Sequence, residues 1–128
     1  MHIPPELRYS REHEWVRLED GLATIGITDF AQDQLGDIVF LDLPEPGASF
    51  EQFAKIGEIE SVKSVSDLFT PVGGEVAERN QAALDTPEIV NQEPYGGGWL
   101  VRLRVTDPAQ LDALLSAEEY AALTAEAQ

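Results

Sequence analysis

Lys63 is the residue in this sequence whose type and surroundings most clearly suggest chemistry. The chain contains two lysines, Lys55 and Lys63. Small and apolar residues flank the second one, in the order Glu60-Ser61-Val62-Lys63-Ser64-Val65-Ser66-Asp67. The amine of a lysine is a strongly hydrated point charge, and such small neighbours would let an enzyme reach it. The pattern favours a functional lysine over the alternative, an ordinary surface lysine.

Other residue types that support catalysis or metal binding occur without a suitable arrangement. The absence of cysteine excludes disulfides and thiolate sites. His2 and His13 lack the spacing of a metal site, so no metal is expected. The sequence has no G-x-S-x-G elbow, and the Gly96-Gly97-Gly98 run lacks the Lys-Ser/Thr of a phosphate loop. We therefore expect no catalytic residues and a protein that is not an enzyme.

The charge balance restricts the partners. The formal net charge is -16, from 24 acidic and 8 basic residues. Nucleic acids and anionic membranes attract clustered Lys and Arg, so neither is an expected partner. Partners with basic docking patches are favoured instead. Residues 1–7 have neither the basic and apolar regions of a signal peptide nor the Arg-rich character of a transit peptide. We expect a cytoplasmic monomer.

The elements that would position Lys63 are mostly strands. A hairpin is predicted over residues 56–70, with Lys63 near its tip, although the turn lacks Asn-Gly or Asp-Gly. A short helix capped by Thr28 or Asp29 should end at Gly36. Alternating or apolar runs predict further strands at 14–18, 23–27, 37–43, 75–78 and 99–105. Residues 80–97 are rich in turn formers, with one helical turn expected near Pro87 to Asn91.

The end of the chain has helical signals. Asp107 can cap a helix that starts at Pro108, a residue type favoured at the first helical position. Ser116 and Glu119 have the spacing of a capping box, which predicts a last helix. We expect a helical segment at about residues 107–126.

Beyond these patterns, the chain resembles a known family. The segment E-S-V-K-S-V-S-D around Lys63 looks like the lipoylation motif of the glycine cleavage system H protein. The resemblance covers nearly the whole chain, through His13-Glu14-Trp15-Val16, Ala23 to Asp29, Ala31-Gln32-Asp33, Leu35-Gly36, Val39 to Gly47, Gly74-Glu75-Val76, Asn91, Pro94-Tyr95-Gly96 and Gly98-Trp99. Together these segments are far more specific than the lysine motif alone.

The resemblance implies a mainly β fold, the barrel-sandwich hybrid of lipoyl domains, with short helices and a C-terminal helical segment. Residues 1–128 would form a single lipoyl-carrier domain with its core at about 14–105. At this length a folded chain can bury roughly two-thirds of its surface, which is enough for one core.

The resemblance also implies a function, with lipoate as cofactor, joined by an amide to Lys63. A lipoate-attaching enzyme would add it. The lipoyl group would accept the aminomethyl fragment of glycine from a pyridoxal-phosphate glycine decarboxylase, the P protein. It would pass the fragment to a tetrahydrofolate-dependent aminomethyltransferase, the T protein. Dihydrolipoyl dehydrogenase, the L protein, would reoxidise it.

The loaded arm would fold into a cleft. Glu14 and Asp67 match motif positions of the family and are the candidate pocket residues, because carboxylates form charge-assisted hydrogen bonds with a protonated amine. The alternative for both is an ordinary surface acid. The chain departs from the family pattern at two positions, with Glu12 in place of a small polar residue and Gln34 in place of the histidine of some members.

Three other functions compete with this one. A lipoyl domain of a 2-oxoacid dehydrogenase, or a stand-alone biotinyl or lipoyl domain, usually centres its motif on Asp-Lys-Ala or Met-Lys-Met, whereas this chain has Val62-Lys63-Ser64. A lipoyl-relay protein for 2-oxoacid dehydrogenases would need the same lysine. A small enzyme has no supporting arrangement of residues.

Overall fold

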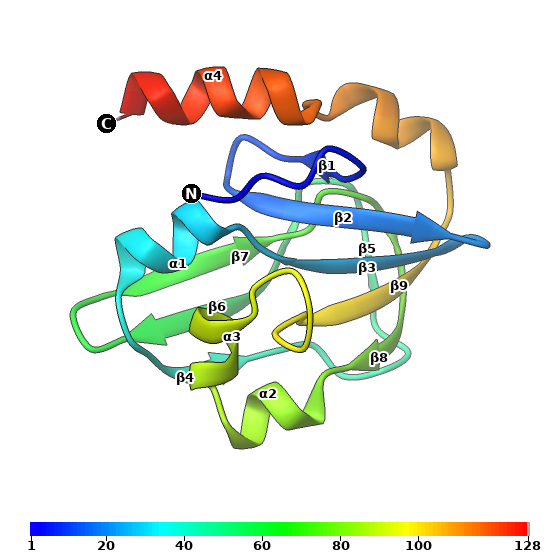
Figure 1. Cartoon of the computed structure of the whole chain (residues 1–128). Helices are drawn as coiled ribbons and strands as arrows, with labels where there is room; N and C mark the ends of the chain where they lie inside the picture. Colours follow the sequence, from blue (N-terminus) through cyan, green and yellow to red (C-terminus); the bar gives the residue numbers. More distant parts are fainter. Residues whose placement is uncertain (128) are drawn as a thin grey trace.

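Two antiparallel sheets form the body of the molecule (Figure 1). The computed structural model describes residues 1–127. The first sheet has the order β1 (Arg8–Tyr9), β2 (Glu14–Glu19), β3 (Leu22–Ile27), β9 (Val101–Val105), β8 (Gly74–Arg79) and β5 (Ser49–Phe50). The second has the order β4 (Ile38–Asp42), β6 (Lys55–Ser61) and β7 (Val65–Phe69). The expected mainly β fold is confirmed.

The main core lies between the two sheets. It is formed by apolar side chains from both, which alternate along each strand with residues of the opposite face. The fully buried members include Val16, Ile25, Ile59, Leu68 and Leu103. In β2 the opposite face is also covered, since Trp15 is completely buried against Leu7, Tyr9 and Tyr120. One strand therefore joins the main core to a second, aromatic cluster.

The predicted strands at 14–18 and 23–27 form a hairpin. Glu19 pairs with Leu22, leaving Asp20 and Gly21 as the two turn residues. Both have positive φ, 52° and 77°, as a two-residue turn that follows the strand twist requires. The first sheet starts earlier than the expected core, because Arg8 and Tyr9 pair with Val16 and Trp15.

The short helix is α1 (Asp29–Leu35). Thr28, not Asp29, is its N-cap and accepts from the backbone N–H of Ala31 at 3.1 Å. Asp29 instead accepts from the Gln32 side chain at 2.8 Å. The helix ends at Gly36, as predicted, where φ is 78° and ψ is -157°. That region of backbone conformation is essentially restricted to glycine.

Two short helices, α2 (Gln81–Asp85) and α3 (Glu88–Gln92), occupy the stretch for which one helical turn was expected. The first was not predicted, since its five residues are too few to show an apolar period. Its Ala83 is buried in the main core. Tertiary packing therefore stabilises this helix.

The C-terminal segment crosses over β1 (Figure 1). It consists of a 3-10 helix, η1 (Pro108–Ala113), and α4 (Ala117–Ala127). The predicted capping box at the start of α4 is present, since Ser116 N donates to the Glu119 carboxylate at 2.9 Å and Glu119 N donates to Ser116 Oγ at 3.2 Å. None of the helices within residues 1–127 combines the length and the apolar character needed to cross a membrane.

Candidate functional site

Lys63 lies at the tip of the β6–β7 hairpin, as the sequence predicts. The turn lacks glycine and is instead stabilised by Ser61, which is 5% exposed. Its backbone N–H donates to Ser64 O at 2.8 Å. Its hydroxyl oxygen accepts from the backbone N–H groups of Lys63 and Ser64 at 3.3 and 3.1 Å. The Lys63 side chain is exposed on this fixed turn.

The end of α1 lies beside Lys63. A Cβ atom on Gly36 would be 3.4 Å from Lys63 Cε and 3.9 Å from Nζ. Asn91 of α3 connects the end of α1 to the start of β4. Its side chain donates to Gly36 O at 2.9 Å and accepts from the Ile38 backbone N–H at 2.9 Å. Asn91 belongs to the segments that match the family, but its spacing in the sequence gives no indication of this bracing role.

A cleft of about 360 Å³ runs beside α1. Its walls combine apolar side chains from both sheets and α1 with polar side chains near the start of β2 and the middle of β7. The lining residues are Glu12, His13, Glu14, Ile27, Phe30, Ala31, Gln34, Leu35, Ile59, Ser66 and Asp67. Both candidate pocket residues therefore line one cleft, together with the two positions that depart from the family pattern.

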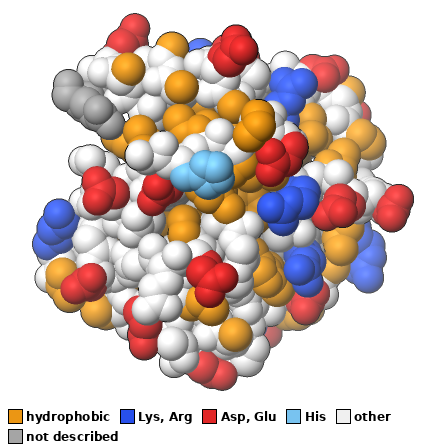
Figure 2. Space-filling view, viewed as in Figure 1, with side chains coloured by type: hydrophobic (Ala, Val, Ile, Leu, Met, Phe, Trp, Pro, Cys, Tyr) orange, Lys and Arg blue, Asp and Glu red, His pale blue; other side chains and the backbone are white. Residues whose placement is uncertain are grey.

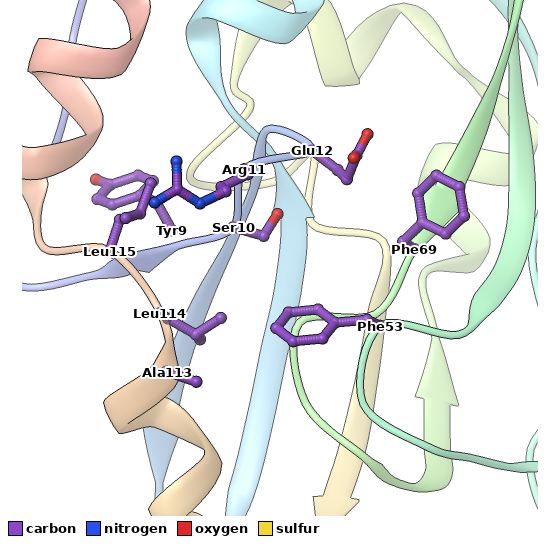
Figure 3. A pocket seen from close by; sticks show the side chains of 9 residues that line it. All are labelled: Tyr9, Ser10, Arg11, Glu12, Phe53, Phe69, Ala113, Leu114 and Leu115. Atoms are coloured by element: carbon purple, nitrogen blue, oxygen red, sulfur yellow. The ribbon is translucent and has the colours of Figure 1, made fainter.

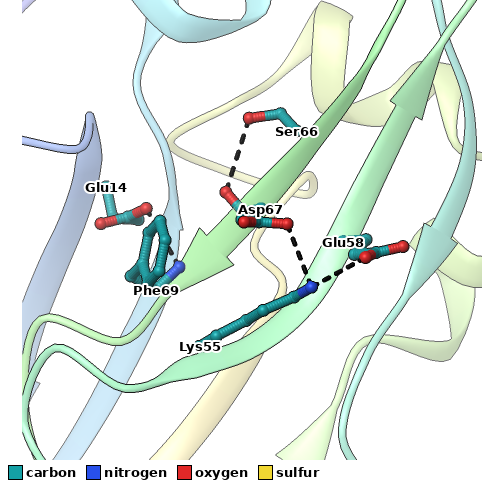
Figure 4. A network of polar contacts seen from close by, with 6 residues as sticks. All are labelled: Glu14, Lys55, Glu58, Ser66, Asp67 and Phe69. Carbon is teal, nitrogen blue, oxygen red and sulfur yellow. Dashed lines mark hydrogen bonds and ion pairs between the residues drawn. The ribbon is translucent and has the colours of Figure 1, made fainter.

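Glu14 is a buried acid, not a surface one, since only 2% of it is exposed. Its carboxyl group accepts from the Ser10 hydroxyl. It also accepts from the Phe69 backbone N–H at 3.3 Å (Figure 4). Burial raises the pKa of Glu14 to about 8, because the two hydrogen bonds offset the lost hydration only partly. Glu14 therefore holds a proton at neutral pH.

Asp67 is exposed and forms an ion pair with Lys55, with 3.1 Å between Lys55 Nζ and the carboxylate. Lys55 also contacts Glu58 at 2.8 Å (Figure 4). These contacts give the two lysines of the chain different environments. Lys55 is paired with two acids, whereas no ion pair involves Lys63 within residues 1–127.

A second cavity, of about 420 Å³, adjoins the cleft at Glu12. Phe53 and Phe69 face it from one side and Leu114 from the other, with Arg11 at its edge (Figure 3). Acidic side chains are spread over the face of the molecule shown in Figure 2, while hydrophobic ones gather below α4. Sequence reasoning gave no indication of this cavity, which brings together residues from four separate segments of the chain.

Known proteins with similar sequences cover almost the whole chain. Residues 7–127 match the family model described as glycine cleavage H-protein. The glycine cleavage system H protein of Symbiobacterium thermophilum is 50% identical over 125 residues, covering 98% of each chain. That of Bacteroides fragilis is 52% identical over 123 residues, covering 96% of this chain and 98% of the relative.

A solved structure agrees with these sequences. The crystal structure of a glycine cleavage system H protein from Mycobacterium marinum superposes with a TM-score of 0.90 at 40% identity. The match covers 96% of this chain and 99% of that one. The chain therefore belongs to the glycine cleavage H-protein family, as its sequence indicates, and its function is that of a carrier in the glycine cleavage system.

Proposed function

We propose that Lys63 bears lipoate through an amide bond and that the whole chain acts as one non-catalytic lipoyl-carrier domain. The observation that supports this most directly is the position of Lys63. It is an exposed lysine without an ion pair in residues 1–127, on a braced hairpin tip, and its side chain lies against Gly36.

The residues around Lys63 fit a lipoyl group. Because Gly36 ends α1, an arm that leaves Lys63 past this glycine meets the cleft along the same helix. Phe30, Ala31 and Leu35 of α1 and Ile59 of β6 give the cleft an apolar wall that suits the hydrocarbon part of the arm. The polar side chains that line the cleft can then contact a polar cargo.

When bound, the lipoyl group supplies the disulfide that takes the aminomethyl fragment of glycine from the P protein, delivers it to the T protein and is reoxidised by the L protein. Because the group is tethered, its local concentration near a docked partner can reach about millimolar. The chain itself positions the group and excludes water from it.

Glu14 and Asp67 are the groups of the cleft that we expect to bind a cationic amine. Asp67 can accept from it as an exposed carboxylate. Glu14 is protonated at neutral pH in the empty cleft, and a neighbouring cation favours its charged form. We therefore expect Glu14 to release its proton when a cationic amine enters, which strengthens the resulting hydrogen bond.

The surface around Lys63 suits docking of partner enzymes. Phe40, Glu60 and Val65 are directly opposite one another on β4, β6 and β7, so their side chains share one face. Phe40 and Val65 are 57% and 58% exposed, and Val62 beside Lys63 is 68% exposed. An apolar patch with acidic neighbours fits an enzyme entrance that combines apolar side chains with Lys or Arg.

Intact mass and peptide mapping of protein purified from its source test the attachment. We expect lipoate on Lys63. An unmodified or biotinylated Lys63 after growth with sufficient lipoate would refute it. Glycine decarboxylation with the cognate P protein tests the carrier role, and a lipoylated protein that cannot accept the aminomethyl group would instead favour the lipoyl-relay function.

A further inference from the structure

We propose that His13 presents its Nε2–H as a hydrogen-bond donor to the sulfur end of the lipoyl arm, and that Tyr120 of α4 is the positioning residue that fixes this form of the imidazole. The proposal rests on the lipoyl-carrier function proposed above. It assigns a role in the arm cleft to the C-terminal helix, which lies outside the cleft.

A chain of hydroxyl groups joins α4 to the cleft. The Tyr120 hydroxyl is 2.8 Å from His13 Nδ1 and 2.7 Å from Thr28 Oγ1. Tyr120 and Thr28 are completely buried. Thr28 Oγ1 also accepts from the backbone N–H of Ala31, as the N-cap of α1. The same oxygen therefore connects the start of α1 with Tyr120.

This arrangement selects one tautomer of His13. If Tyr120 donates to His13 Nδ1, the Thr28 hydroxyl donates to Tyr120 and every hydrogen has an acceptor. If Nδ1 carried a proton and donated to Tyr120, then Tyr120 would donate to Thr28. The Thr28 hydroxyl hydrogen would then lack an acceptor within residues 1–127, which is unfavourable in a buried site. The neutral form with a proton on Nε2 is thus preferred, and burial also lowers the pKa of His13.

The backbone of His13 is held as firmly as its ring. Its φ is 71°, in the left-handed region that non-glycine residues rarely adopt. Its N–H donates to Ser10 O at 3.2 Å, and its carbonyl accepts from Thr28 N at 3.0 Å. A strained conformation persists where its surroundings enforce it, and such residues cluster at ligand sites. With Nδ1 engaged, Nε2 is the ring nitrogen left for the cleft that His13 lines.

The position of His13 matches the far end of the arm. Lys63 meets α1 at Gly36, and His13 contacts Phe30 near the other end, with 4.9 Å between the ring centroids. Phe30 and Gly36 are six positions apart in the sequence, which corresponds to about 9 Å along the axis of α1. The amide of the arm would therefore remain near Gly36, and the sulfur atoms would reach the His13 end. Glu14 and Asp67 can accept from an amine, whereas a sulfur atom, as a weak acceptor, can interact with a donor such as His13 Nε2–H.

Nitrogen NMR of the two imidazoles tests the tautomer. In ¹⁵N-labelled apo protein at neutral pH, we expect His13 to show an unprotonated Nδ1 and a protonated Nε2, with a His2→Gln variant giving the assignment. Tyr120→Phe should convert this to a mixture of both tautomers. Tyr9→Phe is the matched control, because Tyr9 is an equally buried tyrosine stacked on Tyr120 at 4.7 Å whose hydroxyl donates to Pro4 O and not to His13. A protonated Nδ1 in the wild type, or an unchanged tautomer in Tyr120→Phe, would overturn the assignment.

The same signal tests the contact with the arm. In lipoylated protein loaded by the P protein with glycine, the His13 Nε2–H resonance should shift and its exchange with water should slow at least threefold relative to the apo protein. Intact mass is measured first, so that missing lipoate is recognised as a failure of the proposed function. An unchanged Nε2–H signal in protein whose mass shows the loaded arm would refute the donor role.

Discussion

Between about pH 5 and pH 8, the free energy of unfolding of the wild-type protein should depend on pH. Replacing Glu14 by glutamine should remove most of this dependence. Burial raises the folded-state pKa of Glu14 from 4.5 to about 8. Between these values the folded state holds a proton that the unfolded state has lost. Stability therefore falls as the pH rises through this window. The stability that the protonated Glu14 contributes is fully present below pH 4.5 and lost above pH 8.

The size of this change in the free energy of unfolding follows from the pKa shift of Glu14. One pKa unit corresponds to about 1.4 kcal/mol, and integration between pH 5.5 and 8.5 gives a loss of about 3 kcal/mol for this carboxyl group. Glutamine has nearly the same shape and can still accept from the Phe69 backbone N–H. We therefore expect the free energy of unfolding of Glu14→Gln, relative to the wild type, to improve by about 3 kcal/mol from pH 5.5 to 8.5.

Urea unfolding of both proteins at the two pH values measures this difference, and groups that titrate in both chains cancel. Asp67→Asn serves as the control for removing a carboxyl group from the same cleft, because Asp67 is exposed whereas Glu14 is buried. Equal pH slopes for the wild type and Glu14→Gln would show that Glu14 is ionised at neutral pH, and that the proton release proposed on amine binding does not occur.

Four further substitutions test the site. Lys63→Arg should change stability by no more than about 0.5 kcal/mol while abolishing lipoylation, measured by intact mass. Ser61→Ala should cost about 1–2 kcal/mol in urea unfolding, because two turn N–H groups lose their shared acceptor. Gly36→Ala should cost about 1–3 kcal/mol, since its backbone conformation is essentially restricted to glycine, and unchanged stability would refute that reasoning. Phe40→Ser should raise the KM of the lipoate-attaching enzyme about tenfold, roughly 1.4 kcal/mol, with kcat unchanged. Phe53→Ser, which alters a similarly exposed ring on the second cavity, should leave that KM unchanged.

Sequence patterns succeeded where the deciding interactions are local. The end of α1 at Gly36 and the Ser116–Glu119 capping box each depend on residues within four positions of one another. The choice between Thr28 and Asp29 as N-cap depends instead on contacts with residues that are distant in the sequence. Thr28 is buried against Tyr120, 92 residues away, and Asp29 bonds the N-terminal backbone at His2.

The sequence by itself determined that Lys63 is an unusual lysine at a hairpin tip, and the family resemblance supplied lipoate and the pathway. Only the tertiary structure distinguished the two candidate pocket residues of the cleft, Glu14 and Asp67. Glu14 is buried where β2 meets Phe69, 55 positions along the chain, and this burial keeps it protonated although the hydrogen bonds from Ser10 and Phe69 favour its charged form. Asp67, in contrast, remains exposed beside Lys55. Burial and pKa depend on which distant segments fold together, and spacing along the chain does not contain that information.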